Sequence, residues 1–315
     1  MKITVLDGYT CNPGDLSWAP FEKFGDFEAF EYTKRADVLE RCNKSDIIIS
    51  NKTAFPREVL EKLDRPKYIG LISTGYNVVD VKAAKELGIT VTFVPTYGTE
   101  AVAQHTFALI LELANHVALH SDAVKNGQWR DYRKFCFWNT PLFELKGKTL
   151  GIIGYGRIGR ETAKIARAFN MNVIFYSHRD MGEQPDRQVD LHTLLKESDI
   201  VSLHCPLNDE TKGLINAENL GKMKNTAWLI NTARGPSVVD GDLAEALNGG
   251  VIAGAGLDVC TKEPPEEDNP LLTAKNCIMT PHIAWAAKET RERLISLAAQ
   301  NLESYLAGNP VNIAK

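Results

Sequence analysis

The residues of this chain with the clearest chemical signature are three glycines with the spacing G-x-G-x-x-G: Gly154, Gly156 and Gly159. A strand pattern at 149–153 precedes them, and a helix pattern at 160–169 follows. In this setting the first glycine permits a tight turn, the second lets a pyrophosphate approach the backbone, and the third lets the helix pack against the strand. Free N–H groups at the start of the helix attract phosphates. The motif therefore predicts a dinucleotide site, against the alternative of a tight turn without a ligand.

The end of the next predicted strand, at 172–176, indicates which dinucleotide binds. NAD-specific sites usually carry an acidic residue there, about 20 residues beyond the glycines, which holds the ribose 2′-hydroxyl. In this chain the position is Ser177, followed by His178 and Arg179. A serine does not repel a 2′-phosphate, and the two basic side chains can donate hydrogen bonds to it. The sequence thus favours NADP(H), while NAD(H) stays open as the alternative in which Asp180 reaches back to the ribose.

Alternating strands and helices must position these residues. Short apolar strand patterns separated by amphipathic helix patterns indicate parallel sheets covered on both faces. A second strand–helix series runs from 149 to about 281, and a final helix at 288–306 ends before Gly308, a residue type common at helix ends. Between the two series we predict one long helix from about 100 to 126 and an irregular, aromatic-rich stretch to 148. In the N-terminal series the predicted strands are 3–6, 46–50, 68–73 and 90–94, and the predicted helices are 36–44, 56–63 and 78–87.

Composition narrows the classes of function. The 315 residues suffice for two domains, and the net charge of −4 with scattered Lys and Arg argues against a nucleic-acid surface or a polybasic membrane patch. No apolar run is long enough to span a bilayer, and the N-terminus lacks the pattern of a signal peptide. The six cysteines contain no Cys-x-x-Cys pair, so we expect them to stay reduced. We therefore expect a cytoplasmic protein that acts on small molecules without a bound metal.

Three further segments carry a resemblance to a known family. They are NTARG at 231–235, GLDV at 256–259 with the Glu263-Pro264 pair beyond it, and TPHIAW at 280–285. Together with the glycine motif, and in the same order, they resemble the D-isomer-specific 2-hydroxyacid dehydrogenases over essentially the whole chain. Within that family, STGYNVVD at 73–80 and the HIAW ending resemble the glycerate dehydrogenase, or hydroxypyruvate reductase, branch.

This resemblance implies hydride transfer between NAD(P)(H) and a small D-2-hydroxy acid or its 2-oxo partner, with D-glycerate and hydroxypyruvate favoured. It implies that Arg234, Glu263 and His282 are catalytic, although each alone could be an ordinary loop residue. Reduction of a 2-oxo acid needs a proton at the oxygen, and histidine titrates near working pH. A glutamate would orient the imidazole and stabilise its cation. An arginine would bind the substrate carboxylate with a fork of N–H donors.

The resemblance also implies binding roles for less distinctive residues. Asp258 has the alternative of capping a strand end, and Cys205 that of a small buried residue. Among the other six histidines, His105, His116 and His120 are expected to be structural, because no carboxylate partner can be identified from the sequence. The implied contacts are Arg157 and Ile158 to the pyrophosphate, Cys205, Pro206 and Thr211 on the adenosine side, Thr232, Ala233 and Asp258 at the nicotinamide end, and the backbone N–H groups of Thr74 and Gly75, with Arg234 and His282, to the substrate.

For the architecture, the resemblance implies an α/β protein with two doubly wound parallel sheets. A Rossmann cofactor domain at 99–285 would be inserted into a flavodoxin-like substrate domain made of 1–98 and 286–315, with the chemistry in the cleft between them. The aromatic stretch at 129–143 is predicted to form a homodimer surface, against the alternative of a loop folded over its own domain.

Two groups of alternatives stay open. D-lactate dehydrogenase and glyoxylate reductase share the family and differ only in the pocket that selects the substrate. Formate dehydrogenases carry Gln at the position of Glu263, and phosphoglycerate dehydrogenases often carry a further C-terminal domain, so both fit less well. A co-repressor that senses dinucleotides and binds peptides would use the same fold without turnover, because a fold does not by itself settle function.

Overall fold

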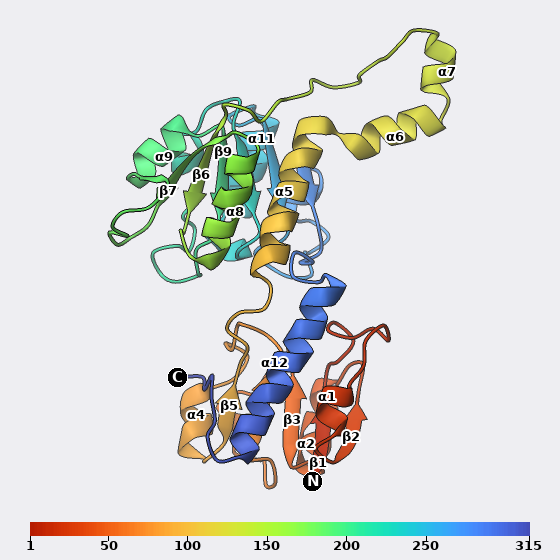
Figure 1. Cartoon of the computed structure of the whole chain (residues 1–315), viewed down its shortest axis with the longest axis vertical. Helices are drawn as coiled ribbons and strands as arrows, with labels where there is room; N and C mark the ends of the chain where they lie inside the picture. Colours follow the sequence, from red (N-terminus) through yellow and green to blue (C-terminus); the bar gives the residue numbers. More distant parts are fainter. The chain divides into compact units, whose positions relative to one another are not determined.

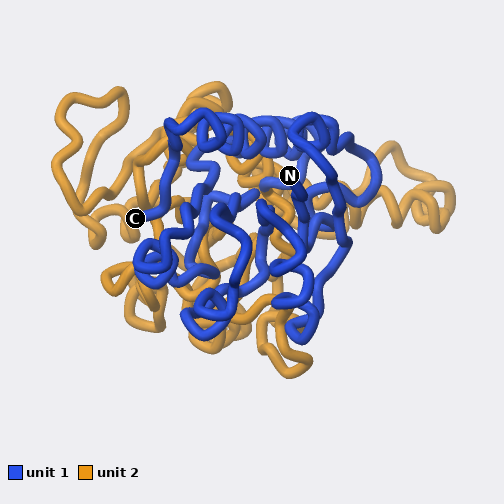
Figure 2. The backbone as a smooth tube through the Cα atoms, turned by 90° about the horizontal axis from the view of Figure 1, so that it is seen from below, with its two compact units in different colours: residues 1–98, 285–315 blue, residues 99–284 orange.

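The structure, a computed structural model, describes all 315 residues, which form two compact units. The first unit consists of Met1–Gly98 and Trp285–Lys315, and the second of Thr99–Ala284 (Figure 2). The second unit is therefore an insertion in the sequence of the first. Each unit encloses hydrophobic clusters of its own on both faces of a central sheet.

The first unit is built on a five-stranded parallel sheet with the order β2-β1-β3-β4-β5, which is the flavodoxin-like order that was predicted. Apolar residues of α1 and α12 cover one face of the sheet, and those of α2, α3 and α4 cover the other. The strands are β1 (Lys2–Val5), β2 (Asp26–Ala29), β3 (Ile47–Ser50), β4 (Tyr68–Leu71) and β5 (Thr90–Thr92). The helices are α1 (Ala19–Glu22), α2 (Val38–Asn43), α3 (Arg57–Leu60), α4 (Val81–Glu86) and α12 (Lys288–Leu306).

The edge strand β2 was not predicted. None of its four residues is fully buried, so it lacks the apolar run that marks the inner strands. The final helix, in contrast, has the predicted bounds and is followed by Gly308 at φ +80°. The difference follows from burial, because only the buried elements carry a strong hydrophobic period.

The second unit is built on a seven-stranded parallel sheet with the order β12-β11-β10-β9-β6-β7-β8. Counted from β6 this is the Rossmann order 3-2-1-4-5-6, extended by β12, as predicted. Helices α5 and α8 lie side by side on one face, and α9, α10 and α11 cover the other (Figure 1). The strands are β6 (Thr149–Ile153), β7 (Asn172–Tyr176), β8 (Arg187–Gln188), β9 (Ile200–Leu203), β10 (Trp228–Asn231), β11 (Gly254–Leu257) and β12 (Cys277–Met279). The helices are α5 (Thr99–Asn115), α8 (Arg157–Ala168), α9 (Leu191–Glu197), α10 (Ala217–Leu220) and α11 (Asp240–Asn248), and short 3₁₀ turns occupy Arg35–Asp37, Gly235–Ser237 and Pro270–Leu272.

The prediction of one continuous helix from about 100 to 126 is wrong. His116 adopts a left-handed conformation (φ 45°) and separates α5 from α6 (Val117–Lys125). Helix α5 buries seven residues, whereas α6 and the following α7 (Gln128–Tyr132) bury none. Figure 1 shows α6 and α7 extending beyond the layers of the second unit. The helical period continues through the break, but packing of the apolar face stops there.

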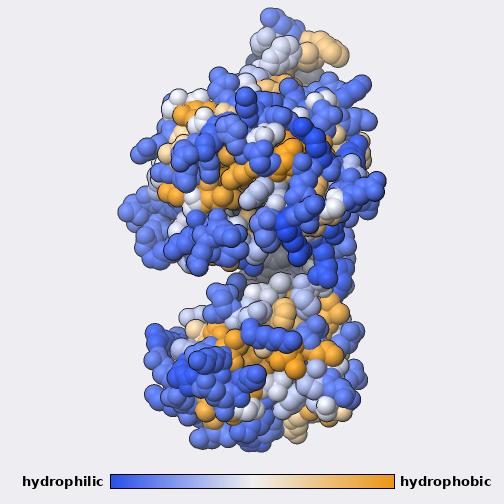
Figure 3. Space-filling view, turned by 90° about the vertical axis from the view of Figure 1, so that its left-hand side faces the viewer, coloured by the Kyte–Doolittle hydropathy of each residue, from blue (hydrophilic) through white to orange (hydrophobic).

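The face of the molecule that Figure 3 shows carries mostly hydrophilic side chains, with separate apolar patches on each unit. None of the helices combines the length and the apolar character needed to cross a membrane.

Candidate functional site

The three predicted catalytic residues follow the carboxyl ends of three neighbouring parallel strands. Strands β10, β11 and β12 pair in register, with Asn231 opposite Leu257 and Leu257 opposite Met279. Arg234, Glu263 and His282 lie in the loops that leave these three ends. Ligands of open α/β sheets bind at this edge, so the strand order brings residues that are distant in sequence to one place.

His282 and Glu263 form a direct pair. The Nδ1 atom of His282 is 2.6 Å from Oε2 of Glu263, and the two side chains are 34% and 38% exposed. A carboxylate can only accept a hydrogen bond, so Nδ1 carries the proton of this bond. The other ring nitrogen, Nε2, is then the atom suited to exchange a proton with a substrate. The structure therefore joins two of the predicted catalytic side chains in the arrangement of an oriented acid–base group.

The loops that carry Arg234 and Glu263 pack backbone against backbone. A Cβ atom added at Gly235 would lie 1.8 Å from the carbonyl oxygen of Cys260, so only glycine fits there. The amide of Cys260 in turn donates to Oε1 of Glu263 over 3.3 Å. Arg234 itself is exposed and uses Nη1 for the carbonyl of Ala233 at 2.7 Å. Its other guanidinium N–H groups are suited to a planar carboxylate.

The thiols near these loops are not acid–base groups. Burial, and then the charge of Glu263, raise the pKa of the Cys260 thiol, and burial raises the pKa of Cys205. Thiols of this kind stay protonated and unreactive at neutral pH.

Asp258 fixes the turn that carries His282. Its carboxylate is buried and accepts the hydroxyl of Thr280 at 2.6 Å and the backbone N–H groups of Ile283 and Ala284, both at 2.8 Å. The N–H of His282 donates to the carbonyl of Asp258 at 2.9 Å. His282 has φ 56°, a left-handed conformation that costs a non-glycine residue about 1–3 kcal/mol and persists only where its surroundings enforce it. Both carboxylate oxygens of Asp258 thus accept hydrogen bonds from the turn. This is the strand-end capping role that was the alternative for Asp258.

The glycine motif forms the turn between β6 and α8. Gly154 has φ +95°, and a Cβ atom there would lie 2.6 Å from the backbone N of Cys205. A Cβ atom at Gly159 would lie 2.3 Å from the carbonyl oxygen of Gly154, so the helix approaches the strand as closely as backbone allows. At Gly156 a Cβ atom would meet nothing within 4 Å, which leaves open space at the start of α8. This space beside a helix N-terminus fits the pyrophosphate of a dinucleotide.

The residues predicted to meet the 2′ position follow β7, which pairs with β6. Ser177 Oγ accepts the N–H of Arg179 at 3.4 Å, and the side chains of His178 and Arg179 are exposed. Asp180 accepts the N–H of Gly182 at 2.8 Å. That carboxylate is thus engaged in its own loop, whereas the two basic side chains form no ion pair.

The remaining predicted cofactor contacts have side chains that the protein itself uses. Thr211 Oγ1 donates to the carbonyl of Pro206 at 2.6 Å and closes the loop after β9. Thr232 Oγ1 lies 3.0 Å from Thr106 Oγ1, and the N–H of Ala233 donates to the side chain of Asn231 at 3.0 Å. The hydroxyls of Thr211 and Thr232 and the N–H of Ala233 are therefore engaged within the chain. Cys205 is buried, and Arg157 and Ile158 form the first turn of α8.

In the first unit, the predicted substrate loop leaves β4. Thr74 Oγ1 donates to the carbonyl of Val94 at 2.9 Å, and Ser73 Oγ donates to the carbonyl of Gly75 at 2.7 Å, so the loop is held in place. The backbone N–H groups of Thr74 and Gly75 have no acceptor within the chain. Two such donors in an exposed, fixed loop are suited to an anion.

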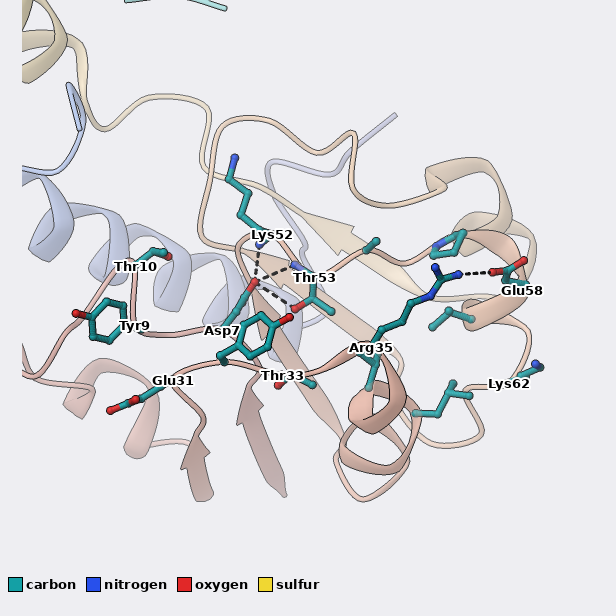
Figure 4. A pocket seen from close by; sticks show the side chains of 16 residues that line it. Asp7, Tyr9, Thr10, Glu31, Thr33, Arg35, Lys52, Thr53, Glu58 and Lys62 are labelled. Carbon is teal, nitrogen blue, oxygen red and sulfur yellow. Dashed lines mark hydrogen bonds and ion pairs between the residues drawn. The ribbon is translucent and has the colours of Figure 1, made fainter. Parts of the chain in front are cut away.

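The first unit also contains a hollow of about 990 Å³ near the carboxyl ends of β1 and β3 (Figure 4). At its centre Asp7 accepts the backbone N–H groups of Lys52 at 2.6 Å and Thr53 at 2.8 Å. Arg35 and Glu58 form an ion pair at 3.2 Å along its wall. Sequence reasoning missed this hollow because three separate loops line it. Acidic and basic groups both face the hollow, so the charge of its lining does not indicate a class of ligand.

A Rossmann sheet with a phosphate-binding glycine turn and an oriented histidine at its strand ends is the arrangement of an oxidoreductase that uses a nicotinamide dinucleotide. Comparison with known proteins identifies the family. The family model for "D-isomer specific 2-hydroxyacid dehydrogenase, NAD binding domain" matches residues 107–284. The chain belongs to the D-isomer-specific 2-hydroxyacid dehydrogenase family.

Relatives of full length support this assignment. The hydroxypyruvate reductase of Blautia hydrogenotrophica is 50% identical over 319 residues, which cover 99% of each chain. The glycerate dehydrogenase of Methylorubrum extorquens is 40% identical over 317 residues, covering 100% of this chain and 99% of the relative. Among solved structures, an acyclic imino acid reductase in complex with NADPH and D-Arg is 35% identical, covers 100% of each chain and has a TM-score of 0.87. The predicted resemblance to the glycerate dehydrogenase branch is confirmed.

Proposed function

We propose that this protein reduces hydroxypyruvate to D-glycerate with NADPH as the hydride donor. The observation that carries the proposal is the hydrogen bond between His282 Nδ1 and Glu263 Oε2 at 2.6 Å, which orients an acid–base group at the edge of the sheet that also holds the glycine turn. The 50% identity to a hydroxypyruvate reductase supports the choice of substrate.

In this proposal the second unit binds the cofactor and carries the acid–base pair. The cofactor, when bound, supplies the hydride that reaches the carbonyl carbon. His282 gives a proton to the carbonyl oxygen, and Glu263 keeps the ring oriented and stabilises its charged form. Arg234 binds the substrate carboxylate and polarises the carbonyl. The fixed N–H groups of Thr74 and Gly75 are further donors for the carboxylate.

The preference for NADPH rests on the loop after β7. The exposed Arg179 and His178 can donate to a 2′-phosphate, and Ser177 places no negative charge beside it. Asp180, the residue that would favour NADH, accepts a hydrogen bond from the N–H of Gly182 within its own loop. An imino acid reductase with the same fold was solved with NADPH.

The test is steady-state kinetics with purified protein. We expect turnover of hydroxypyruvate, slower turnover of glyoxylate and little turnover of pyruvate. Brisk reduction of pyruvate or of a bulky 2-oxo acid, with none of hydroxypyruvate, would overturn the choice of substrate. Oxidised cofactor bound without turnover of any 2-oxo acid would instead support the co-repressor-like alternative.

The cofactor is tested by kcat/KM with NADPH and with NADH. A parent that prefers NADH by about tenfold, roughly 1.4 kcal/mol of discrimination, contradicts the proposal. If NADPH is preferred, Ser177→Asp should remove the preference because a carboxylate repels the 2′-phosphate, with little change in the KM for the oxo acid. Ser177→Ala, which adds no charge, is the matched control and should keep the preference.

We also infer a homodimer formed through the segment 129–143. Its side chains include Phe135, which is 92% exposed, and Trp138, which is 65% exposed, next to helices that bury nothing. Exposed aromatic clusters of this kind are typical of interfaces. Light scattering should give a dimer that Trp138→Asp converts to a monomer, while Tyr32→Asp, at an exposed aromatic of the first unit, leaves the dimer intact.

A further inference from the structure

A second histidine of the second unit, His105 on α5, is connected to the turn that carries His282. Its Nε2 atom lies 2.9 Å from the hydroxyl of Thr280 and 3.5 Å from Oδ1 of Asp258. The Thr280 hydroxyl lies 2.6 Å from the same carboxylate oxygen. These contacts form a continuous chain of polar groups from helix α5, through the end of β12, to the carboxylate that fixes the turn.

The chemistry of these groups decides which atom donates. The carboxylate of Asp258 can only accept, so the Thr280 hydroxyl directs its proton to it. The hydroxyl oxygen then accepts from His105, which must carry a proton on Nε2. Because the carboxylate is wholly buried, its oxygens must accept hydrogen bonds from donors that the chain provides. Those donors are the hydroxyl of Thr280, the N–H groups of Ile283 and Ala284 and, at the longer distance, His105.

We propose that His105 and Thr280 are positioning residues for the acid–base histidine. By holding the Asp258 carboxylate in place they keep His282 in its left-handed conformation, with its ring on Glu263. This inference rests on the proposed role of His282. An acid–base group that is misplaced by about 1 Å loses about 10²-fold in rate, so a partner that never meets the substrate can still affect the chemical step.

Two pairs of variants test the proposal. Thr280→Val removes the hydroxyl and Thr280→Ser keeps it. His105→Phe removes the ring N–H, and His105→Gln offers an amide N–H near the position of Nε2. We expect Thr280→Val and His105→Phe to lower kcat by about 10- to 100-fold while the KM for the oxo acid and the Kd for the cofactor stay unchanged. Serine and glutamine should restore most of the loss.

The isotope effect separates positioning from a merely structural role. With cofactor deuterated at the transferred hydrogen, the effect on kcat should rise in Thr280→Val and His105→Phe, because the chemical step becomes slower than product release. Lower thermal stability with an unchanged isotope effect and unchanged kcat per cofactor-binding site would overturn the proposal. If Thr280→Val does not fold, the same comparison between His105→Phe and His105→Gln decides the matter.

A matched measurement distinguishes this inference from the proposed function. If His282→Ala is inactive while Thr280→Val and His105→Phe turn over at the parental rate, the positioning role is wrong and the function stands. If His282→Ala is itself fully active, the proposed acid–base role of His282 is wrong, and the positioning role falls with it, whereas the proposed substrate and cofactor stand on the kinetics of the parent protein.

Discussion

Two histidine–carboxylate pairs lie at the same edge of the second sheet, and they differ in distance and burial. His282 and Glu263 approach to 2.6 Å with side chains 34% and 38% exposed. His105 and Asp258 approach only to 3.5 Å, with side chains 19% and 0% exposed. In the second pair the Asp258 carboxylate accepts three donors from the turn, whereas Glu263 accepts the ring at 2.6 Å and the N–H of Cys260 at 3.3 Å.

This difference in burial means that two pairs of the same residue types, a histidine and a carboxylate, have different roles. A proton can be passed to a substrate only by a ring that a substrate can reach, which fits His282. A buried carboxylate with several donors instead holds backbone in place, which fits Asp258. The His282–Glu263 pair is therefore suited to proton transfer and the His105–Asp258 pair to holding the backbone in place. The exposure of the side chains distinguishes the two pairs.

The largest expected effect on activity comes from removing the partly exposed ring of His282. His282→Ala should lower kcat by about 10²–10⁴, the usual worth of a positioned acid–base group. Thermal stability should change little, because the ring is partly exposed and the variant keeps the backbone hydrogen bonds of the turn. The measurement is kcat alongside a melting curve. A kcat close to that of the parent would contradict the proposed mechanism. The distinction between a catalytic and a structural histidine–carboxylate pair would then be wrong as well.

Neutralising the buried carboxylate should act first on stability. Asp258→Asn keeps the shape but places an amide N–H₂ against donors of the turn, at a cost of about 2–3 kcal/mol. Denaturant unfolding should show this loss, and activity should fall as well because the turn loosens. An Asp258→Asn variant as stable as the parent would show that the buried pair does not hold the turn.

Neutralising the exposed carboxylate should act on the reaction and leave stability nearly intact. In Glu263→Gln the ring loses the negative neighbour that stabilises its charged form during proton transfer. We expect kcat at neutral pH to fall by about tenfold, less than the loss of about 10²–10⁴ expected when the acid–base group itself is removed. Unfolding measured alongside is the control, and an unchanged kcat would argue against a role for this pair in proton transfer.

A third histidine of the unit sharpens the comparison, because its ring is partly buried and has no carboxylate partner. His204 has Nε2 at 2.9 Å from Ser202 Oγ and a buried Nδ1 without a partner, and burial lowers its pKa to about 3. In the unfolded chain a histidine has a pKa of about 6.5. Between these values the unfolded state binds more protons, so this residue makes stability fall as pH falls through that window.

The check is the slope of unfolding free energy against pH. At pH 5.5, about one unit below the unfolded value, the parent should have lost about 1.4 kcal/mol through this residue. His204→Gln should flatten the slope, whereas the exposed His192→Gln should not. Equal slopes in all three proteins would show that His204 is protonated without penalty.

The Rossmann turn could be predicted from sequence because every part of its signal is local. The three glycines, the strand before them and the helix after them occupy one short stretch, and steric rules assign each glycine its conformation. Helix 288–306 was predictable for the same reason, since its apolar period is set by its own residues. The end of α5 was not, because the period runs past His116 while the packing does not.

The amino-acid sequence by itself therefore determined the two doubly wound sheets, the glycine turn and the residue types available for acid–base work. The family resemblance implied that Glu263 meets His282, but only the tertiary structure showed that His105 meets Thr280 and Asp258. Glu263 lies 19 positions from His282, and Thr280 lies 175 positions from His105, so no local rule links either pair. Strand order and the packing of α5 on the sheet bring them together, because hydrogen bonds depend on distances in space that only the packed core sets.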